Sequence, residues 1–96
     1  MRESALEKKC GKMAKEAGAL WLKWSSPGLR GVPDRVLIYR GAVAFVELKA
    51  PGNKPTKLQA AIHRRLREAG ANVHVIDNVD VFDELLSRLY IKGAVR

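Results

Sequence analysis

Cysteine is nearly absent from this sequence, and so are long apolar runs. The single cysteine, Cys10, cannot form a disulfide within the chain, and no cysteine cluster is available to hold zinc. No stretch of about 18 apolar residues is present that could cross a membrane. The N-terminal residues also lack the apolar segment of a signal peptide. These absences predict a soluble protein of the cytoplasm that has no membrane partner.

Acidic residues are also scarce, and the chain is short. Lys and Arg outnumber Asp and Glu by 18 to 10, which gives a formal net charge of +8. This imbalance favours a polyanionic partner, most often nucleic acid. The 96 residues allow a single domain, 1–96, whose small core self-association could supplement. An apolar content of 47% is ordinary for a folded domain and argues against disorder.

Hydrophobic periodicity predicts an α/β domain with the element order α-β-β-β-α-β-α. The expected elements are a helix over 4–17, strands over 20–24, 34–39 and 42–49, a helix over 56–69, a strand over 72–77, a helix over 79–90 and a loose tail over 91–96. Ser4 and Glu7 fit a capping box at the start of the first helix. The second long helix should return the fourth strand parallel to the third, which gives a mixed sheet flanked by helices.

The second and third strands are predicted to form a hairpin. With a two-residue loop at 40–41, the paired positions always add up to 81, so Asp34 falls directly opposite Glu47. Glu47 and Lys49 share one face because side chains alternate along a strand. A loop of three residues would instead put Asp34 on the wrong face. Two carboxylates and a lysine should therefore meet at one end of the hairpin.

Two opposed carboxylates need a compensating partner, because like charges across a sheet destabilise it. A divalent cation would remove the repulsion, and oxygen ligands suit Mg²⁺ or Mn²⁺. A plainer interpretation also stays open: Glu47 and Lys49 could form an exposed ion pair, and Asp34 could cap the turn after Pro33.

The motifs around these residues resemble those of the PD-(D/E)XK nuclease superfamily, and in particular its virus-type replication–repair nuclease (VRR-NUC) family. That family has a G-x-P-D turn before a strand, an E-x-K on the next strand and a Gln early in the following helix. Here these stand at 31–34, 47–49 and Gln59. The resemblance implies a restriction-endonuclease-like fold and a metal-dependent endonuclease that hydrolyses DNA phosphodiester bonds. Small stand-alone members are typical of bacteriophages, which implies the host cell cytoplasm.

The resemblance also implies a metal site. Asp34 and Glu47, with the backbone carbonyl of Leu48, would hold Mg²⁺ or Mn²⁺, which would bind the scissile phosphate and activate a water. Glu7 matches a further carboxylate that such nucleases often aim at the metal, with Glu3 as its rival one turn earlier.

The remaining candidate roles, which the residues themselves suggest as well, concern the attacking water and the DNA. Lys49 could orient the water or stabilise negative charge on the phosphate. Gln59 could help to position the nucleophile or Lys49, but together with Thr56 it also fits a capping box. His63 could touch the phosphate, although a partly exposed helix histidine is the commoner outcome. The candidate DNA-contacting residues are Arg30, Lys54, Lys57 and Arg64.

The chain leaves little room for a separate DNA-recognition module, so recognition should favour DNA shape over sequence. A symmetric homodimer would present two active sites to branched DNA such as a four-way junction. The competing interpretation is a non-catalytic, basic nucleic-acid-binding protein whose acidic residues are structural. It predicts binding without metal.

Overall fold

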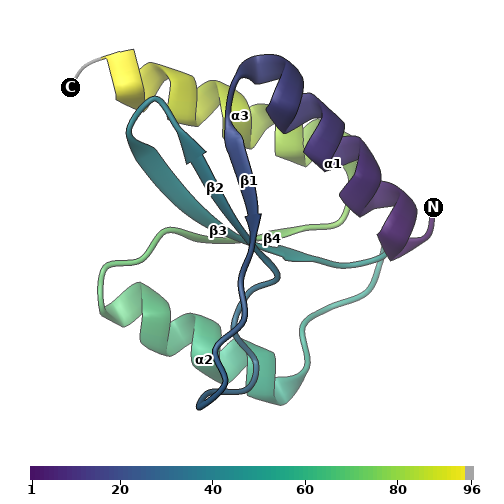
Figure 1. Cartoon of the computed structure of the whole chain (residues 1–96). Helices are drawn as coiled ribbons and strands as arrows, with labels where there is room; N and C mark the ends of the chain where they lie inside the picture. The colour runs from purple at the N-terminus through teal and green to yellow at the C-terminus, as the bar shows by residue number, and fades with distance from the viewer. Residues whose placement is uncertain (95–96) are drawn as a thin grey trace.

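The computed structural model describes residues 1–94 and shows a four-stranded sheet flanked by three helices over that part of the chain (Figure 1). The elements are α1 (Glu3–Ala17), β1 (Leu20–Lys23), β2 (Arg35–Tyr39), β3 (Ala42–Leu48), α2 (Lys57–Glu68), β4 (Val73–Ile76) and α3 (Val79–Ala94). The predicted α/β order is confirmed. Within these residues, none of the helices is both long and apolar enough to cross a membrane.

The sheet has the strand order β1-β2-β3-β4 and is mixed, as predicted. The first three strands are antiparallel neighbours, whereas β4 runs parallel to β3 after the α2 crossover. In the hairpin, Arg35 pairs with Val46 and Tyr39 with Ala42, so the predicted register is confirmed. The turn residues Arg40 and Gly41 have φ of 53° and 83°, the positive values that a two-residue type I′ turn requires.

One face of the sheet is covered by α1 and α3 and holds the apolar core (Figure 1). Four apolar side chains of α3 and three side chains of α1 are buried there. The strand β3 turns every second residue toward these helices. The buried residues of this core face are Leu6, Cys10, Ala14, Leu37, Ala42, Ala44, Val46, Leu48, Ile76, Phe82, Leu85, Leu86 and Leu89.

The opposite face of the sheet carries α2 (Figure 1), and the loop before β2 packs against that helix. Gly31 in this loop has φ of 89°, and a Cβ there would lie 3.2 Å from side-chain atoms of both Leu58 and Ile62. A glycine is therefore needed for this close approach. Ile62 is buried, whereas Leu58 is 49% exposed.

The first helix does not begin as the sequence predicted. Its N-cap is Arg2, and no side chain caps it, so the predicted capping box of Ser4 and Glu7 was wrong. Glu7 Oε2 instead accepts a hydrogen bond from Arg35 Nε at 3.2 Å. Arg35 lies on β2, far away in sequence, and binds the carboxylate that the predicted cap would have used.

The expected loose tail over 91–96 was wrong for 91–94, which continue α3, while Val95 and Arg96 lie outside the described residues. The helix continues because it packs on the hairpin turn. A Cβ at Gly93 would lie only 2.5 Å from Arg40 Cβ, so the absence of a side chain at Gly93 permits the contact.

Candidate active site

The hairpin brings Asp34 and Glu47 together at its open end. Asp34 stands immediately before β2, and its Oδ2 accepts a hydrogen bond from the backbone N–H of Leu48 at 2.9 Å. The backbone carbonyl of Asp34 accepts another from the N–H of Trp24 at 3.0 Å. The Asp34 carboxylate is therefore held against the last residues of β3.

Glu47 is a buried acid. Its relative exposure is 1%, and its Oε1 atom has no hydrogen-bond partner among the described residues. Burial, together with hydrogen bonding and charge from the Asp34 carboxyl, raises the pKa of Glu47 from 4.5 to about 8, while the charge of Lys49 opposes the shift. Near neutral pH the metal-free site therefore favours a proton on Glu47.

Lys49 lies on the same face as Glu47, as predicted. Its Nζ is 4.0 Å from Glu47 Oε2, and 15% of its side chain is exposed. An open polar pocket of about 430 Å³ adjoins it, and Lys54 also lines this pocket. The ammonium group thus links the buried carboxylates to a surface that a phosphate group can reach.

Gln59 forms the predicted capping box and also contacts Glu47, while its role toward the nucleophile or Lys49 stays a prediction. Thr56 Oγ1 accepts from the Gln59 N–H at 3.2 Å, and Gln59 Oε1 accepts from the Thr56 N–H at 2.9 Å, which completes a capping box. The other end of the same amide, Nε2, donates to Glu47 Oε2 at 3.4 Å. The cap therefore fixes the rotamer that aims the amide N–H₂ at the acid.

His63 also belongs to this cluster. It follows Gln59 by one helical turn and is 1% exposed, so the expectation of a partly exposed histidine was wrong. Its Nε2 lies 3.4 Å from Glu47 Oε1. Burial lowers the pKa of His63, and the charge of Arg67 lowers it further. The spacing from Gln59 was the available signal, because residues four apart share a helix face.

Of the two candidate acids on α1, the structure brings Glu3 beside Lys49. Glu3 lines the same polar pocket as Lys49, and its charge adds to the shift that raises the pKa of Glu47. Glu7 is half-buried in the ion pair with Arg35. The rival position one turn earlier is therefore the better placed of the two.

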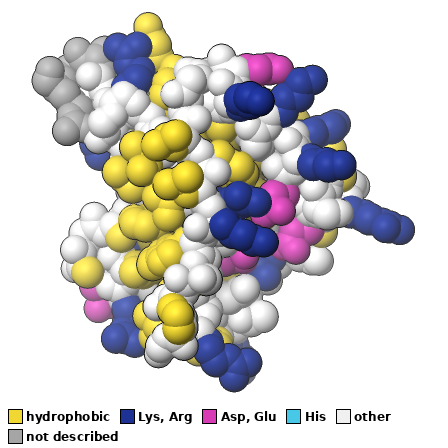
Figure 2. Space-filling view, viewed as in Figure 1, with side chains coloured by type: hydrophobic (Ala, Val, Ile, Leu, Met, Phe, Trp, Pro, Cys, Tyr) yellow, Lys and Arg dark blue, Asp and Glu magenta, His cyan; other side chains and the backbone are white. Residues whose placement is uncertain are grey.

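The four predicted DNA-contacting residues are all exposed. Lys54 is next to Lys49 in the polar pocket, and Lys57 is the first residue of α2. Arg30 lies in the loop before β2, and Arg64 lies on α2. Figure 2 shows acidic side chains next to basic ones beside a band of hydrophobic side chains, with further basic side chains spread around the edge of the view.

The carboxylate oxygens of Asp34 and Glu47 suit a hard divalent cation that needs few ligands from the protein. Within the described residues, no group of three or more His, Cys, Asp or Glu side chains is placed to hold a metal ion. Mg²⁺ is commonly bound by only one or two carboxylates together with waters and phosphate oxygens. Asp34 and Glu47 meet that requirement, and the unpartnered Glu47 Oε1 is a buried oxygen with ligand capacity to spare.

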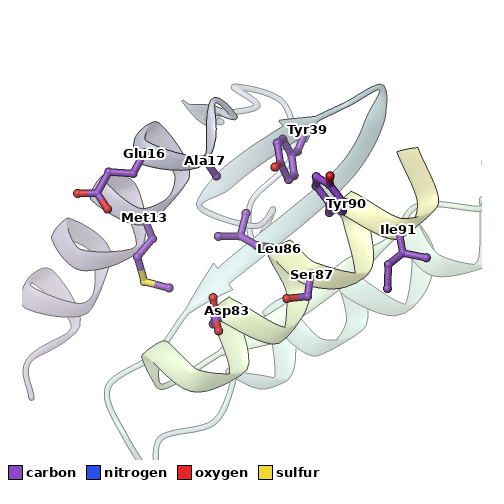
Figure 3. Close-up of a pocket in the computed structure, with 9 residues that line it drawn as sticks. All are labelled: Met13, Glu16, Ala17, Tyr39, Asp83, Leu86, Ser87, Tyr90 and Ile91. Atoms are coloured by element: carbon purple, nitrogen blue, oxygen red, sulfur yellow. The ribbon is translucent and has the colours of Figure 1, made fainter. Parts of the chain in front are cut away.

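A pocket of about 560 Å³ between α1 and α3 is separate from these carboxylates (Figure 3). It is lined by Met13, Glu16, Ala17, Tyr39, Asp83, Leu86, Ser87, Tyr90 and Ile91. Tyr39 is at the far end of β2 from Asp34, about 16 Å away at the usual rise of a strand. The chemistry at the open end of the hairpin therefore does not extend into this pocket.

A phage protein and a solved structure are among the known proteins that this chain resembles, although no protein-family model matches it. The chain is 44% identical over 82 residues to the protein named "Putative nuclease p44" of Acyrthosiphon pisum secondary endosymbiont phage 1, and the match covers 84% of this chain and 88% of that protein. A solved structure described as a VRR_NUC domain superposes with a TM-score of 0.80 and 34% identity, covering 88% of this chain and 94% of the other. With the fold, the hairpin register and the paired carboxylates, these similarities show that the chain belongs to the VRR-NUC nuclease family, as a small phage-type member.

Proposed function

We propose that this protein is a Mg²⁺- or Mn²⁺-dependent DNA endonuclease that acts as a homodimer on branched DNA. The observation that carries the proposal is a pair of neighbouring acids, the buried Glu47 carboxyl and the Asp34 carboxyl beside it. Two such acids destabilise the fold unless a cation or a proton neutralises one of them, so a functional demand is the better explanation. The phage relative is named a nuclease, and the chain belongs to a nuclease family. Both facts support phosphodiester hydrolysis as the reaction.

In this proposal Asp34 and Glu47 hold the cation, with the Leu48 carbonyl as a third oxygen and Glu3 or Glu7 as a further acid. A cation bound there supplies Lewis-acid polarisation of the scissile phosphate and lowers the pKa of a bound water. The Leu48 N–H keeps Asp34 oriented, and the Gln59 amide does the same for Glu47.

Lys49 is proposed to contact the reacting phosphate. Its ammonium group is 4.0 Å from Glu47 and partly open to solvent, so it can stabilise negative charge on the phosphate or orient the attacking water. Lys54, Lys57, Arg30 and Arg64 are proposed contacts to the DNA backbone. Backbone contacts of this kind set position and affinity, and they carry no sequence information.

The homodimer is supported by exposed apolar side chains on the α2 side of the sheet. Leu20 and Leu22 of the edge strand β1 are 56% and 44% exposed, and Val43 of β3 is 40% exposed. The strand register places all three on the same face. Light scattering should give a dimer for the wild type and a monomer for L20E/L22E. The control I91E changes an exposed residue of α3 and should stay dimeric, and a monomeric wild type would contradict the proposal.

The test of function is cleavage of a labelled four-way junction and a matched linear duplex with Mg²⁺, Mn²⁺ or EDTA. Wild type should cut the junction preferentially and only with metal, and Asp34→Asn and Lys49→Ala should both abolish cutting. Asp83→Asn makes the same charge change on an exposed position of α3 and should cut normally. Metal-independent binding without cutting, unchanged in the variants, would support the non-catalytic binding protein instead.

A further inference from the structure

Two buried polar atoms face each other at the centre of the site, and neither has a hydrogen bond. Glu47 Oε1 and His63 Nε2 are 3.4 Å apart, and they are the two buried side-chain atoms without a hydrogen-bond partner among the described residues. Both side chains are 1% exposed, so water does not compensate at the surface. Native proteins rarely leave such groups unsatisfied, which points to a different state of the site in which the contact becomes a bond.

Cation binding selects that state, because a metal-bound Glu47 is ionised. A neutral imidazole carries one N–H, and an ionised carboxylate only accepts hydrogen bonds. When Glu47 is ionised and His63 carries its proton on Nε2, a single charge-assisted bond satisfies both atoms. Such bonds have lengths of about 2.7–2.9 Å, so the two atoms need to approach each other by about half an ångström or slightly more.

A second hydrogen bond to Glu47 would also restrict the rotation of its carboxylate. The last torsion of a glutamate is soft and roughly two-fold, so a carboxylate held at one oxygen can still rotate. The Gln59 amide contacts Oε2 at a long 3.4 Å, while His63 approaches the other oxygen. Both helix residues sit on one face of α2, so a single rigid element holds the two ends of the carboxylate.

We propose that His63 is a positioning residue, which donates from Nε2 to Glu47 Oε1 and holds the ionised carboxylate in the orientation that binds the cation. This inference rests on the proposed metal site at Asp34 and Glu47. It assigns His63 no contact with DNA or with the reacting phosphate. Its function is to make the metal site tight, by holding the Glu47 carboxylate in one orientation.

The test is titration of Mn²⁺ into the metal-free protein by calorimetry, without DNA. His63→Leu fills similar space but lacks the donor, and it should weaken Mn²⁺ binding by about 10–100-fold, the usual effect of losing a residue that orients a metal ligand. His63→Gln keeps an N–H donor and should bind within about threefold of wild type, since the orienting bond is retained. Thermal unfolding of each variant reports whether the fold is intact.

A measurement on the wild type needs no variant to fold. Nitrogen NMR of the His63 ring before and after saturation with Mg²⁺ should show a proton on Nε2 in the Mg²⁺-bound state, protected from exchange. An Nε2 without a proton in that state would overturn the role, as would folded His63→Leu that binds Mn²⁺ as tightly as wild type. A wild type that binds no Mn²⁺ would instead overturn the metal site itself, and with it this inference.

Discussion

Alternate residues of β3 point to opposite faces of the sheet, and the two faces differ in chemistry. The face toward α1 and α3 receives only apolar side chains from this strand, such as Ala44 and Val46, and they are completely buried. The face toward α2 receives Val43, which is 40% exposed, and the buried acid Glu47. One face therefore stabilises the domain, whereas the other combines reactive groups with apolar surface left open.

Buried ionisable groups show the same contrast. On the core face, Cys10 is fully buried, and burial raises the pKa of its thiol to about 11, so it stays neutral. On the α2 face, Glu47 is equally buried but has Lys49, Gln59 and His63 around it, so its charged form has partners available. The comparison shows that burial alone does not make a site; the site needs groups that can stabilise the ion.

A pair of matched leucine truncations should show the stabilising role of the core face. Leu85→Ala on α3 removes a side chain that is 2% exposed, and it should cost about 2–5 kcal/mol of unfolding free energy. Leu58→Ala on α2, where 49% of the residue is exposed, should cost about 1 kcal/mol or less. Urea unfolding of both variants gives the two values. Equal losses would mean that the two faces contribute alike.

Gln59 allows the cap and the site to be separated on the α2 face. Gln59→Glu keeps a capping-box residue but replaces the N–H₂ donor toward Glu47. Cleavage should fall by about 10–100-fold, as when a residue that orients a metal ligand is lost, with little change in stability. Thr56→Ala should do the reverse, with a loss of about 1 kcal/mol in stability from the missing cap and a smaller change in rate. Stability losses of the same size in both variants, with unchanged rates, would leave Gln59 only its cap.

The pH dependence of stability should reveal the buried acid. Because the pKa of Glu47 in the folded protein is about 8 against an ordinary 4.5, the folded state keeps a proton that the unfolded state releases between these values. In EDTA, raising the pH from about 5 to about 8 should therefore lower the melting temperature of wild type more than that of Glu47→Gln. The exposed control Glu84→Gln should follow wild type, and identical pH curves for wild type and Glu47→Gln would rule out the titration.

Local patterns in the sequence predicted the hairpin and most of the site. The two-residue turn at Arg40-Gly41 specifies the register through its backbone conformation, and the register brings Asp34 to Glu47. Gln59 follows from a short motif at the start of a helix. These features depend on neighbours a few residues apart or on the period of a strand, which is why the sequence alone contains them.

The features that the sequence did not predict depend on contacts between distant elements. The spacing from Gln59 places His63 on the same face of α2, but its burial depends on the contact of that helix with Glu47 on β3, which the spacing does not specify. Glu7 pairs with Arg35 on β2 and does not form the predicted helix cap. The end of α3 stays helical because Gly93 packs on the turn at Arg40. In each case a tertiary contact overrides the local preference.

The most direct test of a catalytic rather than structural role for the α2 face is a comparison of binding and cutting by Glu47→Gln. If Glu47 is a metal ligand, we expect this variant to bind a labelled four-way junction as tightly as wild type in EDTA and to be at least as stable there. With Mg²⁺, we expect the variant to cut at least about a hundredfold more slowly, because loss of a ligand should exceed the effect of losing a residue that orients one. A Glu47→Gln protein that still cuts at the wild-type rate would contradict the account.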